Sequence, residues 1–301
     1  MLEIDRSILE KFETQIEPHQ LRGAKVLGYG EISTVFEVDG LPGVACKRMP
    51  LFKSVTDAET YARQYATYCG NLKTAGLVLP EDRTEIFDQP GKPVVLYIIQ
   101  QQLSPARFVH KLLHQLTDSE IDALVIRVLT AINHVWEFNA KHQPGLQLAI
   151  DGQLSNWVYM ESGELFYIDT STPLYRINEK EQLDPELFLQ SAPSFLRWLI
   201  RWLFLADVMN RYYDPRQVAI DVAANLYKEQ RPDLVPRVVE LINSSKPAGV
   251  DSIIVKDVEK YYKEDKIIWV VFLALRRFDR WLKSTIFRQR YEFVLPGKIK
   301  R

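Results

Sequence analysis

The sequence predicts an α+β protein with two lobes, a small antiparallel sheet followed by a mainly helical part. Three observations lead to this prediction. Extended runs rich in β-branched residues and joined by turn signals fill much of the first hundred residues. Helical periodicity dominates after Ser104. The chain has 301 residues, 47% of them hydrophobic, which is enough to bury a large core around a cleft.

The N-terminal elements begin with a helix and a hairpin. Charged and apolar residues alternate over residues 1–20, which predicts an amphipathic helix and not a secretory signal. Residues 25–49 contain two extended runs joined at the turn Asp39-Gly40, with a glycine-containing bend before them. We therefore expect a helix and then two paired strands.

A second helix and two more strands follow. Residues 56–72 predict a helix, because Thr and Asp stand at the start, alanines lie within, and Gly70 stands near the end. Residues 84–100 return to an extended pattern around a turn at Pro90-Gly91. The predicted order is strand, strand, helix, strand, strand.

The clearest helix covers residues 118–142. Its apolar residues recur at helical spacing and predict one wall of a core: Ile121, Leu124, Val125, Val128, Leu129, Ile132, Val135 and Trp136. After a break at Pro144-Gly145 we expect an extended entry, a loop and a hairpin turning at Ser162-Gly163. Beyond Pro185 the pattern is mainly helical. The boundary near residues 100–104 divides a lobe of residues 1–102 from one of 103–301.

Charge and cysteine content limit the expected binding partners and the expected cellular compartment. The formal net charge is -1, so no global field draws the molecule to nucleic acid or to an anionic membrane. The two cysteines, Cys46 and Cys69, have neither metal-ligand spacing nor the pattern of a disulfide framework, so we expect a cytoplasmic protein. The apolar segments are shorter than the roughly 20 residues that cross a bilayer, so we predict no transmembrane helix.

A glycine-containing turn opens the candidate site. Gly28 and Gly30, with Ser33 and Val35 after them, form a bend whose unhindered backbone amides can approach phosphate oxygens. Paired glycines near a hairpin are more often simple turn chemistry. Its assignment as a phosphate-binding turn therefore depends on the residues that follow it in the sequence.

A lysine and a carboxylate follow. Lys47 ends the apolar run Val44-Ala45-Cys46, where an exposed lysine at a strand edge is the ordinary alternative. Glu59 lies in the next predicted helix, with Asp57 as its rival, although such carboxylates usually face solvent. An ammonium held by a carboxylate is suited to binding phosphate oxygens.

Three further polar residues complete the set. Asp151 and Asn156 lie in one loop, and Asp169 ends the following apolar strand. Oxygen ligands of this kind suit Mg²⁺, and a second aspartate can orient a hydroxyl nucleophile. Isolated Asp and Asn residues also cap turns. Here, however, the glycine turn, strand lysine, helix glutamate, loop pair and strand-end aspartate occur in a consistent order.

In this order the residues resemble the protein-kinase-like superfamily over about residues 22–172, and the chain is closer to aminoglycoside and choline phosphotransferases than to typical protein kinases. The resemblance implies a site for ATP and Mg²⁺. By position, Gly28, Gly30, Ser33 and Val35 resemble the glycine-rich loop, Lys47 the phosphate-binding lysine, Glu59 its partner, Asp151 the catalytic aspartate, and Asn156 and Asp169 the metal ligands.

Departures from the family pattern guide the expected function. Ala149-Ile150 replace the loop-bracing histidine and its neighbour, Gln153 replaces a lysine, and Thr170-Ser171 replace Phe-Gly. The segment between Asp169 and Asp184 is short for an activation loop, which favours a small-molecule acceptor. We expect a phosphotransferase acting on a hydroxyl. The alternative is a non-catalytic, kinase-like nucleotide-binding or regulatory module.

The C-terminal residues 276–301 hold nine Lys/Arg against two Asp/Glu, interleaved with aromatic residues. Such a segment can contact an anionic membrane or nucleic acid. The commoner arrangement buries the aromatics in the core and leaves the basic groups in solvent.

Overall fold

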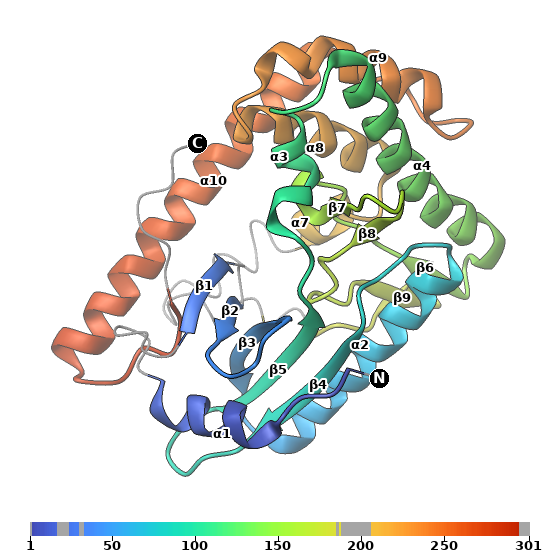
Figure 1. Cartoon of the computed structure of the whole chain (residues 1–301). Helices are drawn as coiled ribbons and strands as arrows, with labels where there is room; N and C mark the ends of the chain where they lie inside the picture. The colour runs from blue at the N-terminus through green and yellow to red at the C-terminus, as the bar shows by residue number, and fades with distance from the viewer. Residues whose placement is uncertain (1, 17–23, 30–32, 185–186, 188–205, 295–301) are drawn as a thin grey trace.

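The computed structural model describes residues 2–16, 24–29, 33–184, 187 and 206–294. These residues form one five-stranded sheet, two smaller sheets and a series of helices (Figure 1). The protein therefore has the mixed α and β composition that was predicted, with a small antiparallel sheet near its N-terminus. None of the described helices is long and apolar enough to cross a membrane.

The five-stranded sheet is antiparallel, in the order β1-β2-β3-β5-β4. Its strands are β1 (Ala24–Tyr29), β2 (Thr34–Val38), β3 (Val44–Phe52), β4 (Asp82–Phe87) and β5 (Val94–Gln101). The predicted turn at Asp39-Gly40 is confirmed between β2 and β3, where Gly40 has a φ of +86°. The sheet has one strand more than predicted, because β1 and β2 are separate strands where one extended run was expected.

Two helices cover opposite faces of this sheet. The predicted N-terminal helix is α1 (Arg6–Gln15), and the helix predicted over residues 56–72 is α2 (Val55–Thr74). Cys46 of β3 packs in one core with Phe12 of α1, whereas Met49 packs in another with Tyr61 of α2. Because side chains alternate along a strand, Lys47 lies on the α2 face.

A buried ion pair fixes α1 to the sheet. Both carboxylate oxygens of Glu13 accept hydrogen bonds from the guanidinium of Arg48, at 2.7 and 2.8 Å, and Tyr97 donates to the same carboxylate. Arg48 also donates to the backbone oxygen and the carboxylate of Glu292. The segment after the last helix thus returns to the N-terminal sheet.

The helical part supplies the larger core. Its helices are α3 (Val109–Leu112), α4 (Asp118–His142), α7 (Ala206–Arg211), α8 (Pro215–Lys228), α9 (Val235–Ser245) and α10 (Val255–Trp281), with 3₁₀ turns at Pro105–Arg107, Leu154–Asn156 and Pro232–Leu234 and a π-helical turn at Leu282–Ile286. The predicted bounds of α4 are confirmed, and all eight of its predicted core residues are buried. Thr117 and Glu120 form the capping box that starts it.

Short strands connect these helices. They are β6 (Leu146–Leu148), β7 (Trp157–Tyr159), β8 (Leu165–Tyr167), β9 (Tyr175–Ile177) and β10 (Lys180–Glu181). The hairpin predicted to turn at Ser162-Gly163 is confirmed as β7–β8, and β10, β9 and β6 form a separate three-stranded sheet. The helical pattern predicted beyond Pro185 is confirmed from residue 206; residues 185–186 and 188–205 lie outside the described part. The domain boundary near residues 100–104 stays a prediction.

Candidate functional site

Three residues of the predicted nucleotide site lie in one row across neighbouring strands. Gly28 on β1 is the register partner of Val35 on β2, and Val35 is the partner of Lys47 on β3. Register partners project on the same face of a sheet, so Val35 and Lys47 share the face that α2 covers. Ser33 directly precedes β2, and Gly30 lies outside the described residues.

Lys47 reaches from the sheet to the residues that follow β8. Its side chain is 9% exposed, its Nζ donates a 2.9 Å hydrogen bond to the backbone oxygen of Ile168, and Oδ1 of Asp169 is 3.9 Å away. Burial lowers the pKa of Lys47, and the Asp169 carboxylate opposes this shift. The ammonium is therefore held in place with part of its charge uncompensated, as an anion-binding group requires.

The pairing expected between Glu59 and Lys47 is wrong. Glu59 is exposed on α2, as is its rival Asp57, and Asp169 supplies the carboxylate within 4 Å of Lys47. The inward face of α2 is occupied by buried aromatic residues, which exclude a glutamate from that position: Tyr61, Tyr65 and Tyr68.

The open end of the β7–β8 hairpin brings the loop and strand-end residues together. The hairpin register pairs Trp157 with Tyr167, and the next hydrogen bond joins the N–H of Ile168 to the oxygen of Asn156 at 3.0 Å. Asp169 follows at once. Nδ2 of Asn156 donates to the backbone oxygen of Asp151 at 3.3 Å. The hairpin end therefore brings together three predicted site residues, Asp151, Asn156 and Asp169. Lys47 approaches this group from the sheet through its contact with Asp169.

The loop that carries Asp151 is braced without a histidine. The N–H of Ala149 donates to the oxygen of Leu174 at 3.1 Å, and the hydroxyl of Tyr68 donates to the oxygen of Ala149 at 2.8 Å. At Gly152, a Cβ atom would come within 2.9 Å of Ile132 and Val222. Contacts from α2, α4 and α8 therefore fix this loop.

Asp151 is electrostatically unusual. Its carboxylate is half-buried and accepts a 3.1 Å hydrogen bond from the N–H of Gln153. Burial, then the carboxylates of Asp221 and Asp169, raise the pKa of Asp151 well above its ordinary value. A carboxylate in this environment is a stronger base than a solvated one.

A polar cluster on α8 was missed in the sequence. Asp221 and Asn225 are 5% and 1% exposed, and Asn225 donates to the side chain of Gln153 at 3.5 Å. Lys228 is 3.9 Å from Asp221 and 3.0 Å from Asp265 on α10. The available signal was an Asp and an Asn at i and i+4 within the otherwise apolar run of residues 218–226.

The residues after Asp169 are built into the core. Thr170 is fully buried and accepts a 3.0 Å hydrogen bond from Gln100 of β5, and Ser171 donates to Oδ1 of Asp169 at 3.2 Å. The hydroxyl of Tyr61 donates to the backbone oxygen of Ser171 at 2.5 Å. Thr170-Ser171 thus orient Asp169 through hydrogen bonds to β5 and α2.

The donor set fits a hard divalent cation shared with a phosphate ligand. Asp169 is about one-third exposed and supplies carboxylate oxygens. The hydrogen bond from Nδ2 of Asn156 to Asp151 fixes the orientation of the amide and leaves its oxygen as a second ligand. Mg²⁺ commonly takes one or two protein oxygens and completes its shell with phosphates and water. Among the described residues there is no cluster of three His, Cys, Asp or Glu that would hold a metal unaided.

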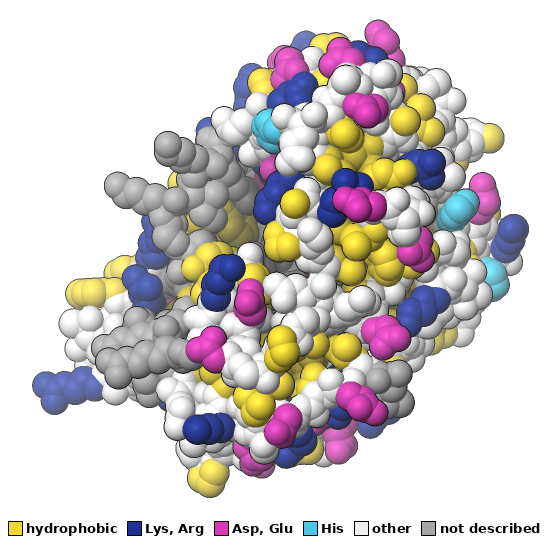
Figure 2. All heavy atoms as spheres, in the orientation of Figure 1, with side chains coloured by type: hydrophobic (Ala, Val, Ile, Leu, Met, Phe, Trp, Pro, Cys, Tyr) yellow, Lys and Arg dark blue, Asp and Glu magenta, His cyan; other side chains and the backbone are white. Residues whose placement is uncertain are grey.

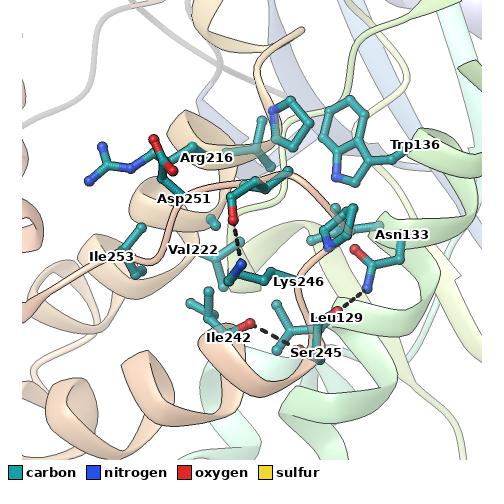
Figure 3. Close-up of a pocket in the computed structure, with 16 residues that line it drawn as sticks. Leu129, Asn133, Trp136, Arg216, Val222, Ile242, Ser245, Lys246, Asp251 and Ile253 are labelled. Atoms are coloured by element: carbon teal, nitrogen blue, oxygen red, sulfur yellow. Dashed lines mark hydrogen bonds between the residues drawn. The ribbon is translucent and has the colours of Figure 1, made fainter. Parts of the chain in front are cut away.

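Two pockets lie elsewhere. One, between α4, α8 and α9, has a volume of about 20 Å³ and is lined mainly by apolar side chains; at its rim Asn133 donates to the backbone of Ser245 (Figure 3). It is a packing gap on the scale of one water. The other is an open hollow between α7, α8 and α10 that includes Arg211 and Tyr261. Neither contains a predicted site residue.

Comparison with known proteins assigns the chain to a family of unknown function. A family model described as a family of unknown function, DUF6206, matches residues 12–280. No curated protein matches the chain significantly. A solved structure titled "WaaP in complex with acyl carrier protein" is similar at 14% identity and a TM-score of 0.35, covering 84% of this chain and 92% of that chain.

Proposed function

The chain belongs to DUF6206, a family of unknown function, and we propose that it is an ATP- and Mg²⁺-dependent phosphotransferase with the two-lobed arrangement of protein-kinase-like proteins. The observation that carries the proposal is the contact of Lys47 with Ile168 and Asp169. A buried cation from the sheet meets a strand-end carboxylate beside Asn156 and Asp151. Phosphoryl transfer relies chiefly on such positioned charges.

Each residue has a role in this proposal. Lys47 would contact the phosphates of ATP, and the row of Gly28 and Val35 would lie against the nucleotide. Asn156 and Asp169 would hold Mg²⁺, which neutralises phosphate charge when bound. As the nucleotide takes up the charge of Lys47, the hydrogen bond to Ile168 would keep the ammonium in position.

Asp151 would orient the acceptor hydroxyl and accept its proton late in the transfer. The hydrogen bond from Gln153 holds one of its oxygens, so the other can face the acceptor. The raised pKa makes Asp151 a stronger base than a solvated aspartate, as a proton acceptor requires. Asp221 would support this state by its negative charge, acting through Asp151 and not on the acceptor.

A small-molecule acceptor is favoured by the segment after Asp169. It forms β9 and β10, which pair with each other and, through β9, with β6. Glu181 of β10 is also fixed, because the hydroxyl of Tyr213 donates to it at 2.9 Å and Arg176 lies 3.4 Å away. A segment tied down in this way offers little extended backbone for a peptide substrate.

The two cysteines are buried free thiols, consistent with the proposed cytoplasmic location.

One observation favours the alternative, a non-catalytic nucleotide-binding module. Glu59 does not pair with Lys47, and that pair is part of the active arrangement in protein kinases. Turnover separates the two functions. The purified chain would be incubated with ATP, Mg²⁺ and pooled hydroxyl-bearing metabolites, and ATP consumption compared with that of Asp151→Asn. Acceptor-dependent consumption that Asp151→Asn abolishes supports the phosphotransferase. Nucleotide binding with equal, background consumption by both proteins supports the module.

A further inference from the structure

We propose that the outer face of α10 and the turn after it dock on an anionic membrane surface. This inference is independent of the proposed phosphoryl transfer. It starts from a set of large apolar side chains that are 46–64% exposed, here called the outer stripe: Ile267, Val270, Val271, Phe278, Trp281, Ile286 and Phe287. Among the described residues only six other large apolar side chains are comparably exposed, and they are scattered over the molecule.

The outer stripe is continuous because of helix geometry. Its members on α10 follow one another at intervals of one, three, four or seven residues, with the exposed Ala274 in between, so they fall on one face. The opposite face contains the buried Leu273 and Arg276. Arg276 lies over the ring of Phe293, which returns from the C-terminal segment. This inward side already packs α10 against the protein, and a surface helix needs only one such side to pack, so the outer stripe is not required for the fold.

Basic groups accompany the outer stripe. Residues 266–288 contain one acidic residue, Asp279, and six Lys/Arg, of which Arg276 is 2% exposed and the other five are more exposed. Asp279 is 4% exposed and is 3.0 Å from Lys283, so it contributes little negative charge to the surface. In Figure 2 hydrophobic and Lys/Arg side chains lie together along the edge that α10 forms in Figure 1. A helix with an apolar stripe and basic flanks is the type that lies in the interface of anionic bilayers.

The same features argue against other partners. A second copy of the chain would bring the basic flanks of two outer stripes together, and like charges at an interface are unfavourable. Nucleic acid would accept the basic groups but leave the aliphatic side chains in water. Phe278 and Trp281 stack with ring centroids 5.8 Å apart at the end of the stripe, and aromatic side chains are favoured at the headgroup level.

The test is co-sedimentation of the full chain with vesicles of phosphatidylcholine alone and of phosphatidylcholine with phosphatidylserine. We expect salt-sensitive binding to the anionic vesicles and little to the neutral ones. Replacing Ile267, Val271 and Trp281 by Ser should weaken binding by about tenfold or more. The matched control Ile126→Ser with Ile177→Ser removes exposed apolar groups elsewhere and should bind like the wild type.

A charge variant provides a second, milder test. Arg280→Gln with Arg288→Gln should weaken binding by about fivefold per charge, with an unchanged melting temperature. The inference is overturned if wild-type protein does not bind anionic vesicles, if it binds neutral ones equally, or if both variants bind like wild type. It is also overturned if light scattering shows a dimer that the Ser variant dissociates while vesicle binding persists.

Discussion

Nζ of Lys47 and Oδ1 of Asp169 lie 3.9 Å apart, although one belongs to the N-terminal sheet and the other follows the β7–β8 hairpin. The contact joins the two parts of the chain at the proposed nucleotide site. Nζ of Lys47 also donates a hydrogen bond to the backbone oxygen of Ile168, which fixes the position of the ammonium. Two of the predictions below, those for Lys47 and Asp169, concern this contact directly.

Substitution of Lys47 tests its role directly. Lys47→Met keeps the apolar stem and removes the ammonium, so affinity for ATP with Mg²⁺ should fall about 10- to 100-fold, the worth of a charge-assisted hydrogen bond. Titration calorimetry would measure it. Because Glu59 is exposed and does not contact Lys47, Glu59→Gln is the matched control and should bind ATP normally. Equal affinity of Lys47→Met and wild type would refute the assignment.

Tyr68 is expected to matter for stability. Its hydroxyl satisfies the carbonyl of Ala149, which is fully buried. Tyr68→Phe leaves that oxygen without its donor and should cost about 1–3 kcal/mol of unfolding free energy, measured by urea denaturation. Tyr29→Phe, at an exposed tyrosine, should cost almost nothing. A Tyr68→Phe protein as stable as Tyr29→Phe would show that the brace is unimportant.

Two glycines should respond to alanine in opposite directions. At Gly152 the added Cβ would come within 3.0 Å of Ile132, Val218 and Val222, so Gly152→Ala should destabilise the protein by about 1–3 kcal/mol. At Gly70 in α2 nothing lies within 4 Å, and Gly70→Ala should stabilise it by about 0.5–1 kcal/mol. Thermal denaturation gives both signs, and the same sign for both would contradict the packing described for the Asp151 loop.

His110 is expected to make the protein sensitive to acid. Burial, with smaller contributions from the charges of Lys111 and His114, lowers the pKa of His110 to about 4. In the unfolded chain the imidazole takes up a proton near pH 6.5. Its contribution to stability is therefore present above pH 6.5 and is lost as the pH falls toward 4. As the pH falls from 6.5 toward 4, the melting temperature of His110→Phe should therefore rise relative to that of the wild type. A difference in melting temperature that stays constant with pH would contradict this prediction.

Periodicity in the sequence was sufficient for the large elements. The spacing from Ile121 to Trp136 predicted α4 with its observed bounds, because a long amphipathic pattern has few alternative structures. The hairpin turn at Ser162-Gly163 was also predictable, since Gly163 adopts a φ of +89° that other residues avoid. Local chemistry decides such features.

The partners of α2 could not be predicted in the same way. Helical spacing shows which residues share a face, but the rotation of α2 against the sheet depends on tertiary packing. Tyr61, Tyr65 and Tyr68 recur at helical spacing, and buried phenols need hydrogen-bond partners. That was a signal for the inward face and against Glu59. The spacing of Asp221 and Asn225 was visible in the sequence, but the proximity of Asp221 to Asp151 was not, because it depends on how α8 packs on the loop.

The most direct test of the central claim is the Mg²⁺ dependence of ATP binding by wild type and Asp169→Asn, measured by titration calorimetry with Mg²⁺ and with EDTA. Asp169 supplies the carboxylate of the proposed metal site. We predict that wild-type protein binds ATP at least about tenfold more tightly with Mg²⁺, and that Asp169→Asn loses this difference while its melting temperature is retained. Failure of wild-type protein to bind ATP with Mg²⁺, or equal binding in EDTA, would contradict the proposed site.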